Sequence, residues 1–259
     1  MVMISIGITE DELENLETAL TRHSALVSFD QLAEIFEEDR QYLRKRISKL
    51  TKKGWLFRIK KGLYVVSDLH SRGTLSISQY SIVNALVDQA YISFESALQY
   101  HGYFDQLLNK VSSIATKQYQ DKVIGGYTFS FVKTLPEYFY GWESHHIDGQ
   151  AVKIASKEKA LIDLIQFHRN RYSIDLVIEK LGNYKNEFDL ELLIDLCFKS
   201  NAATQRILGF VLDCLKFDSS RLSKALQTSK GTSRITDSAE NLYNSKWRLY
   251  YDRYFERYV

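Results

Sequence analysis

Ten lysines and arginines and no acidic residue lie between residues 40 and 61. These residues are Arg40, Arg44, Lys45, Arg46, Lys49, Lys52, Lys53, Arg58, Lys60 and Lys61. A cluster of cations this dense can bind phosphate. Residues 1–39 instead carry ten acids and a single base, Arg22, and the formal net charge of the whole chain is only +2. Because a local basic field steers a protein to phosphate whatever its total charge, this asymmetry favours nucleic acid as a partner.

The spacing of the apolar residues indicates how these cations are held. Leu43, Ile47 and Leu50 recur at helical spacing, so they form one buried stripe and leave most of the basic side chains pointing outward. Gly54 is placed to end this helix, since glycine takes positive φ at low cost. Two β-prone runs, 55–59 and 63–66, then flank a Lys-Lys-Gly turn and predict a hairpin with a basic tip.

Two further helices are predicted upstream by their capping signals. Thr9 with Glu12, and Ser28 with Gln31, have the spacing of capping boxes, and Asp39 can cap the basic helix. Three short helices followed by a hairpin predict a winged helix-turn-helix DNA-binding domain over residues 1–68.

In this arrangement the basic helix enters the major groove and the hairpin tip lies over the phosphate backbone. We expect base contacts from Arg40, Gln41 and Arg44. We expect phosphate contacts from Lys45, Lys49, Lys60 and Lys61, and the same surface includes Tyr42, Ser48 and Arg58. The acids at 37–39 would repel phosphate unless they cap the helix or accept from a cytosine amino group. The plainer alternative is a basic helix face that is merely solvated.

The remainder predicts a linker at 69–80 and a mixed α+β C-terminal domain at 81–259. Short strands with local turns suggest a small antiparallel sheet, with strands at 112–116, 127–133, 138–142 and 151–154. One helix is expected to start near Ser78, and a second is expected after Ser93, which would cap it. Further helices are expected at 157–168, 174–181, 190–199 and 204–215. The aromatic residues of 247–258 have helical spacing, yet 247–251 also suits a strand. Such a stripe most often packs on its own domain, and a partner surface is the alternative.

The polar residues offer few patterns that are typical of catalysis or metal binding. Neither G-x-x-x-x-G-K-[ST] nor G-x-G-x-x-G occurs in the sequence. His145 and His146 would point to opposite faces of a strand, so they are not expected to share a metal ion. Asp163 is expected to be a buried carboxylate bonded to backbone or to an arginine, and His101 to end a helix. We therefore expect no catalytic residues, no metal and no cofactor, and we do not expect an enzyme.

The composition and the N-terminal sequence indicate where in the cell the protein is expected. The chain is 45% hydrophobic and 25% charged, as in ordinary globular proteins, and has no apolar run of 18 residues. The acidic start argues against a signal peptide, and Cys197 and Cys214 suit buried thiols in a reducing compartment. We expect a cytoplasmic protein with no membrane partner.

The order of the sequence blocks resembles the AbiEi family, the antitoxin and repressor half of bacterial abortive-infection toxin–antitoxin operons. Four blocks carry the resemblance. They are the hairpin block (Leu50, Lys53-Gly54-Trp55-Leu56, Arg58-Ile59 and Lys61-Gly62-Leu63-Tyr64), the block at 92–102 (Ile92-Ser93, Ser96-Ala97-Leu98 and His101-Gly102), the block at 154–163 (Ile154-Ala155 and the run from Glu158 to Asp163), and Trp247-Arg248-Leu249. The last of these resembles the family's terminal strand and favours a strand there. The chain departs from the pattern at Glu37-Glu38-Asp39 and after Lys216.

The resemblance implies a repressor that binds inverted repeats in its own operon's promoter, two copies per operator. It also implies a C-terminal domain that counteracts a co-encoded nucleotidyltransferase-like toxin, in the context of phage defence. The alternative is an antitoxin that binds and sequesters its toxin directly, with DNA binding secondary. An enzyme that modifies the toxin is a third and weaker alternative, for which the sequence lacks a nucleotide-dependent signal.

Overall fold

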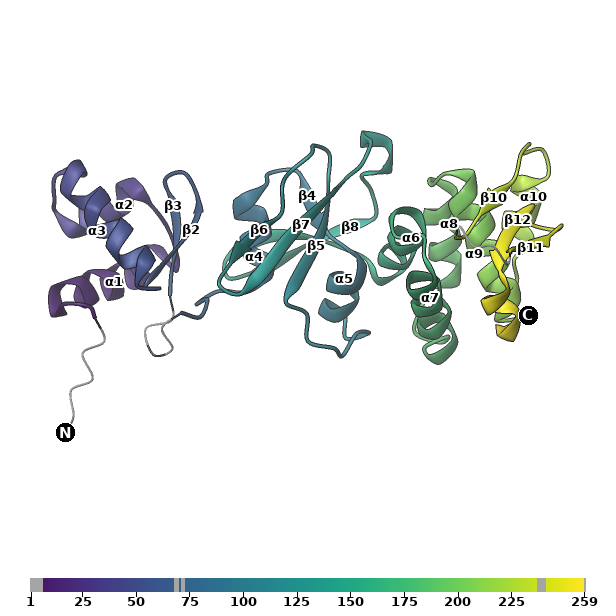
Figure 1. Ribbon diagram of the computed structural model, residues 1–259, viewed down its shortest axis with the longest axis horizontal. Helices are drawn as coiled ribbons and strands as arrows, with labels where there is room; N and C mark the ends of the chain where they lie inside the picture. The colour runs from purple at the N-terminus through teal and green to yellow at the C-terminus, as the bar shows by residue number, and fades with distance from the viewer. Residues whose placement is uncertain (1–6, 68–69, 71–72, 237–240, 259) are drawn as a thin grey trace.

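The structure is a computed structural model, which describes residues 7–67, 70, 73–236 and 241–258. It is an α+β protein with helices and several separate sheets. Figure 1 shows an elongated molecule in which the basic helix lies at one end and the last strands lie at the other. Between them stand a central sheet and a group of packed helices.

The N-terminal part alternates helices and strands in the order α1 (Glu10–His23), β1 (Leu26–Ser28), α2 (Phe29–Phe36), α3 (Arg40–Lys52), β2 (Leu56–Lys60) and β3 (Leu63–Val66). Both predicted capping boxes are confirmed, at the starts of α1 and α2. Asp39 caps α3 by accepting a hydrogen bond from the backbone N–H of Gln41 at 2.8 Å. These caps satisfy backbone donors that a helix start leaves unpaired.

The hairpin β2–β3 follows α3 directly. Gly54 has φ +78° and Gly62 has φ +76°, the left-handed conformation that both turns require. The sequence did not predict β1, a three-residue strand that pairs antiparallel with β3 and completes a sheet of order β1–β3–β2. Leu43, Ile47 and Leu50 are buried with Trp55 in the core under α3, which confirms the apolar stripe.

The central sheet has six strands, β4 (Ala90–Ile92), β5 (Lys110–Ala115), β6 (Lys122–Ile124), β7 (Tyr127–Lys133), β8 (Trp142–Ile147) and β9 (Gln150–Ala155). Its order is β6–β7–β5–β4–β9–β8, with β5–β7 and β4–β9 parallel. The prediction of a small antiparallel sheet is therefore wrong. Local turn signals identify hairpins between consecutive strands, whereas these two parallel pairs join strands that are not consecutive.

One predicted strand, 138–142, is also wrong. Residues Pro136–Tyr138 form a 3₁₀ turn, η1, and β8 begins only at Trp142. Pro136 fixes φ at the start of this turn, and Gly141 has φ +75° immediately before the strand, so the backbone is bent where the propensity suggested extension. The predicted strands at 112–116, 127–133 and 151–154 correspond to β5, β7 and β9.

Helix α4 (Gln79–Leu86), which starts next to Ser78 as predicted and is capped by its side chain, and α5 (Phe94–Tyr100) pack on the central sheet. The helical group follows as α6 (Lys157–Phe167), α7 (Arg171–Asn183), α8 (Leu190–Phe198), α9 (Ala202–Cys214) and α10 (Ser220–Leu226). The helices predicted at 157–168, 174–181, 190–199 and 204–215 are confirmed as α6 to α9. Residues of the helices and of the central sheet share one continuous apolar core.

The chain ends in a small sheet of order β10–β12–β11, formed by Ser233–Arg234, Leu249–Asp252 and Asn241–Asn244, and in a 3₁₀ segment η2 (Arg253–Tyr258). The strand interpretation of this region is thus confirmed for 249–252, and Trp247 lies buried just before the strand. Among the residues that the structure describes, no helix is long and apolar enough to cross a membrane.

Candidate nucleic-acid interface

Helix α3 presents one fully polar face to the outside. All seven of the predicted contact residues on this helix are exposed, namely Arg40, Gln41, Tyr42, Arg44, Lys45, Ser48 and Lys49. The centre of this face is a row at i, i+4, i+7 and i+11, formed by Gln41, Lys45, Ser48 and Lys52. Because the opposite stripe is buried, the helix cannot rotate without exposing its apolar residues, and the row is held outward.

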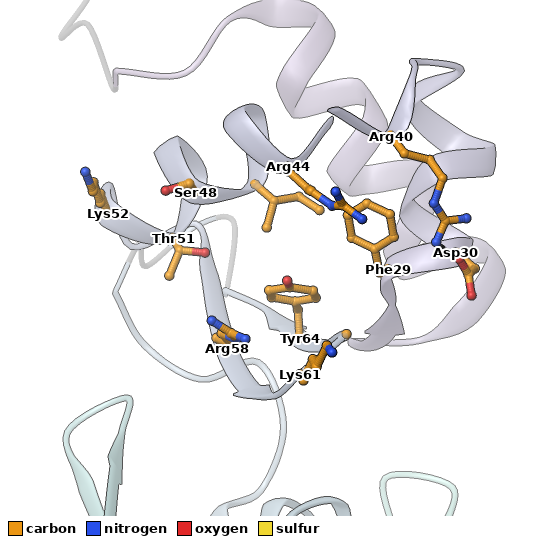
Figure 2. A pocket seen from close by; sticks show the side chains of 12 residues that line it. Phe29, Asp30, Arg40, Arg44, Ser48, Thr51, Lys52, Arg58, Lys61 and Tyr64 are labelled. Atoms are coloured by element: carbon orange, nitrogen blue, oxygen red, sulfur yellow. Dashed lines mark ion pairs between the residues drawn. The ribbon is translucent and has the colours of Figure 1, made fainter. Parts of the chain in front are cut away.

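A groove of about 910 Å³ runs between α3, the start of α2 and the hairpin (Figure 2). It is lined by Phe29, Asp30, Arg40, Arg44, Ile47, Ser48, Thr51, Lys52, Arg58, Lys61, Gly62 and Tyr64. Five of these residues are cationic and one is acidic, so the field in the groove favours an anion. Figure 2 shows Arg58 and Lys61 on the hairpin side and Arg44 and Lys52 on the helix side.

Phe29 organises two of the arginines. The guanidinium carbons of Arg40 and Arg44 lie 5.0 and 5.9 Å from the centroid of its ring. Arg40 also forms an ion pair with Asp30 at 2.8 Å. These contacts hold Arg40 at the edge of the groove, toward α2 rather than along the central row of α3.

The hairpin is fixed on both of its sides. The backbone N–H of Phe29 donates to the carbonyl oxygen of Gly62 at 2.8 Å, which ties the hairpin turn to the start of α2. On the far side, Ile59 and Val65 pack into the larger core, and Lys122 of β6 donates to the carbonyl of Ile59. Burial, and then the nearby charge of Arg58, lower the pKa of Lys122. The tip residues Lys60 and Lys61 stay exposed.

Some of the cations serve the fold. Arg46 donates to Asp11 at 2.8 Å and pairs with Glu38. Partial burial opposes the charged form of Arg46, but the hydrogen bond to Asp11 and the charge of Glu38 outweigh it and raise its pKa. Lys53 donates to the carbonyl of Gly7 and faces the protein.

The acidic turn before α3 is largely neutralised. Glu38 pairs with Arg46, and Asp39 caps the helix, so these two carboxylates are engaged within the protein. Glu37 is exposed and has φ +49° at the end of α2. Helix capping, the first of the two roles considered for these acids, is therefore the one that Asp39 performs.

The structure brings Arg40, Arg44, Ser48, Arg58 and Lys61 into the groove, and it places Tyr42 and Lys49 on the other flank of α3. The lining residues Phe29, Thr51 and Tyr64 were not singled out from the sequence. Phe29 carried one usable signal, because it is an aromatic residue at the first position of α2, on the same stripe as Leu32 and Phe36 but only partly buried there.

A second polar cluster is buried between α5 and α6. Asp163 accepts hydrogen bonds from the hydroxyls of Ser93 (2.6 Å) and Tyr91 (3.1 Å) and pairs with Lys159. Ser93 occupies the N-cap position of α5, as expected, but its hydroxyl donates to this carboxylate and makes no capping hydrogen bond. The prediction that Asp163 bonds to backbone or to an arginine is wrong, since Lys159, one helical turn away, supplies the opposite charge.

This cluster is a structural core rather than an open site. Lys159 and Asp163 both have fully buried side chains. Burial raises the pKa of Asp163, against the opposing charge of Lys159. His101 lies at the end of α5 as predicted, and its Nε2 donates to the carbonyl of Ala155 at 2.8 Å. These bonds tie the two ends of α5 to the middle of α6 and to the end of β9.

The remaining candidate metal ligands do not converge. On β8, His145 is half-buried and His146 is exposed, as the alternation of a strand predicts. Within residues 7–67, 70, 73–236 and 241–258, no group of three or more potential ligands has a metal-binding arrangement. Cys197 is buried and Cys214 partly buried, and burial raises the pKa of each thiol to about 12.

No protein-family model matches this chain, and no curated protein matches it in sequence. Its fold is similar to the crystal structure of the RV2827C protein from Mycobacterium tuberculosis, with a TM-score of 0.66. The alignment covers 94% of this chain and 92% of that one at 14% sequence identity. At this identity the likeness concerns the fold.

Proposed function

We propose that the chain is a sequence-specific DNA-binding repressor whose N-terminal part is a winged helix. The observation that carries the proposal is the basic groove between α3 and the hairpin, which has cations on both walls and a rigid base. The strand order β1–β3–β2 around three helices is the arrangement that a winged helix would have. DNA would place a phosphate backbone against the hairpin while α3 lies in the major groove.

The geometry refines the roles of the contact residues. The central row of Gln41, Lys45 and Ser48 is best placed for base edges, where Gln can pair with adenine and Lys with guanine. Arg44, Arg58, Lys60 and Lys61 would bind phosphates on either side of the groove. Arg44 and Lys45 thereby exchange the roles expected from the sequence. Arg40 moves from the base-reading set to a positioning role, because Asp30 and Phe29 hold it at the groove edge.

We further propose that this repressor is the antitoxin of an AbiEi-like toxin–antitoxin operon, acting in the cytoplasm and in phage defence. The sequence blocks that resemble the family support the antitoxin proposal, since two of them are in contact in the folded chain. The block at 92–102 and the block at 154–163 are joined by the hydrogen bonds from Ser93 to Asp163 and from His101 to Ala155. A co-encoded nucleotidyltransferase-like toxin would be the functional partner, and two copies would bind inverted repeats.

The test is fluorescence anisotropy of the purified chain with DNA from immediately upstream of its own gene. A scrambled duplex and a salt series run beside it. Binding to the upstream DNA at least about a thousand-fold tighter than to the scrambled duplex is the expected result. Equal and steeply salt-dependent binding to both duplexes would overturn the repressor proposal and reduce the groove to a non-specific patch.

Direct sequestration of the toxin is the second candidate function. It is favoured by Leu107, which is 96% exposed in the segment after α5, and by the pocket that its neighbour Gln106 shares with the half-exposed Tyr172 of α7. Apolar side chains that gather in one exposed patch are typical of protein-interaction surfaces, and tyrosine is enriched there. If Leu107→Asp abolishes toxin rescue in cells while own-promoter binding is retained, sequestration is the dominant activity. If rescue is unchanged, the surface around Leu107 has no such role.

A further inference from the structure

Arg206 is a buried cation in the helical group, remote from the basic groove. It lies on α9, at the opposite end of the molecule from α3 (Figure 1), and only 4% of the residue is exposed. A buried charge is costly unless it is paired and hydrogen-bonded. The partners of this guanidinium therefore need an explanation.

All of the hydrogen-bond partners of Arg206 are neutral oxygens. Its guanidinium donates to the hydroxyls of Ser233 (2.9 Å) and Ser229 (3.0 Å) and to the carbonyl of Lys230 (3.2 Å). Among the described residues, no carboxylate forms an ion pair with it. An arginine has five N–H donors, and the bonds to described residues use neither the Nε–H nor all of the Nη1 group.

A second arginine approaches the same point. Arg248 donates to the carbonyl oxygen of Ser229 at 2.8 Å, and Arg206 reaches the same oxygen at 3.4 Å. Burial first, and then the charge of Arg248, lower the pKa of Arg206. Two like charges thus converge on one carbonyl, and the acceptors that they reach within the described part of the chain are neutral.

The two arginines line a cavity of about 230 Å³ between α9, the end of α10 and the turn before β12. Its other lining residues are Ser223, Leu226, Gln227, Ser245, Lys246 and Trp247. Lys246 adds a third cation, although it is paired with Asp213 at 2.7 Å. The cavity therefore combines excess positive charge with hydroxyl and amide donors, which are the groups that bind oxoanions.

We propose that this cavity binds a small phosphoryl oxoanion, either inorganic phosphate or the phosphate of a monoester. The anion would supply the counter-charge that Arg206 and Arg248 lack and would accept from Ser223 and Gln227. A cavity of this size accommodates a phosphate group and leaves a larger substituent at the open side. The site is independent of the proposed DNA interface, which uses other residues at the other end of the chain.

The test is isothermal titration calorimetry of the full chain with inorganic phosphate at pH 7.5 and constant ionic strength, adjusted with chloride. Saturable binding of one phosphate per chain is expected for the unmodified protein. Arg248→Gln should weaken this binding at least about ten-fold, because it removes an exposed cation that donates to the carbonyl of Ser229 rather than to a carboxylate. A matched control, Arg221→Gln on α10, should bind phosphate as the unmodified chain does.

A second variant keeps the test decisive if Arg248→Gln fails to fold. Gln227→Glu is isosteric, lies at the exposed rim, and introduces a carboxylate that competes for the arginines. It should abolish phosphate binding. Absence of saturable heat with the unmodified chain, or equal affinity in the Arg248→Gln and Gln227→Glu variants, would overturn the proposal.

Titration with AMP separates the two sources of phosphate. Equal affinities for phosphate and AMP would identify the free ion as the ligand, and tighter AMP binding would identify a monoester. Binding of AMP without binding of phosphate would contradict recognition of the phosphoryl group itself and would overturn the proposal.

Discussion

Asp30 and Arg40 form an ion pair of 2.8 Å that joins the first turn of α2 to the first turn of α3 at the edge of the basic groove. Both side chains are largely exposed, so the pair adds little to folding stability. Its effect is instead on the field of the groove, because Asp30 is the one acid among the lining residues. The carboxylate partly cancels the charge that would meet a DNA phosphate.

Asp30→Asn should therefore strengthen DNA binding. Removing one opposing charge near the phosphates is worth roughly 1 kcal/mol at low salt, or about a five-fold gain in affinity. Anisotropy with the upstream duplex measures it, and the free energy of unfolding should change by less than about 0.5 kcal/mol. Glu34→Gln, on the same helix but outside the groove, is the control and should leave affinity nearly unchanged. A weaker complex for Asp30→Asn would show that the carboxylate itself contacts DNA.

The proposed division between base and phosphate contacts predicts opposite behaviour for Gln41 and Lys61. Lys61→Ala should weaken binding to the upstream and scrambled duplexes alike and reduce the slope of log K against log salt by about 0.9. Gln41→Ala should cost about 1–3 kcal/mol on the upstream duplex and little on the scrambled one. A salt series with both duplexes measures both effects. If the two variants behave alike, the assignment of these roles is wrong.

Local chemistry explains what the sequence could predict. The caps at Thr9, Ser28 and Asp39 and the turn at Gly62 are decided by residues close in the chain, so α1 to α3 and the hairpin were placed correctly. The exposed face of α3 followed from its buried stripe in the same way. The pairing of Arg40 with Asp30 was not foreseen, because it depends on how α2 and α3 cross.

Contacts between residues far apart in the chain explain the features that the sequence did not predict. Strand β1 exists because it pairs with β3, and β4 aligns with β9 through Ile92 and Ile154, far along the chain. Ser93 had a good local capping signal, but a buried carboxylate 70 residues away outcompeted the backbone for its hydroxyl. The cavity at Arg206 has no sequence signal, since its partners come from a loop and a turn that only the fold brings together.

The buried pair of Lys159 and Asp163 should be strongly non-additive. Lys159→Met leaves an uncompensated buried carboxylate and should destabilise the chain by about 3–5 kcal/mol. The double variant Lys159→Met/Asp163→Leu removes both charges and should cost less than the sum of the two single variants. Urea unfolding of the four proteins measures the coupling. Additive costs would mean that the two charges do not stabilise one another.

His168 should make stability depend on pH. Its ring stacks on Phe94 with centroids 4.2 Å apart, and burial is the main cause that lowers its pKa, with Lys110 acting in the same direction and Glu95 and Asp163 against it. A lowered folded-state pKa means that the unfolded chain binds the proton more readily. The stabilising contribution is therefore full above the unfolded pKa of about 6.5 and is lost as the pH falls.

The measurement is urea unfolding at pH 7.5 and pH 5.5 for the unmodified chain and for His168→Asn, which does not titrate. The loss of stability on acidification should be smaller in the variant. An equal loss in both proteins would assign the pH dependence to other groups.

Gly209 should resist substitution although it lies within α9. Alanine normally stabilises a helix interior by up to about 1 kcal/mol relative to glycine. Here a Cβ atom at residue 209 would lie 2.3 Å from Cη2 and Cζ3 of Trp247, whose indole is buried and donates to Asp213 at 2.7 Å. Because the ring is held at both its face and its nitrogen, it cannot move away cheaply. Gly209→Ala should therefore destabilise the chain by about 1–3 kcal/mol, the usual cost of overpacking.

Gly182→Ala in α7 is the matched control, since a Cβ atom there would lie 3.4 Å from its nearest neighbour, Leu215 Cδ2, which leaves room for a methyl group. Gly182→Ala should be neutral or slightly stabilising when both variants are unfolded in urea. If Gly209→Ala were equally well tolerated, the contact between α9 and the turn before β12 would be looser than the packing of Trp247 indicates.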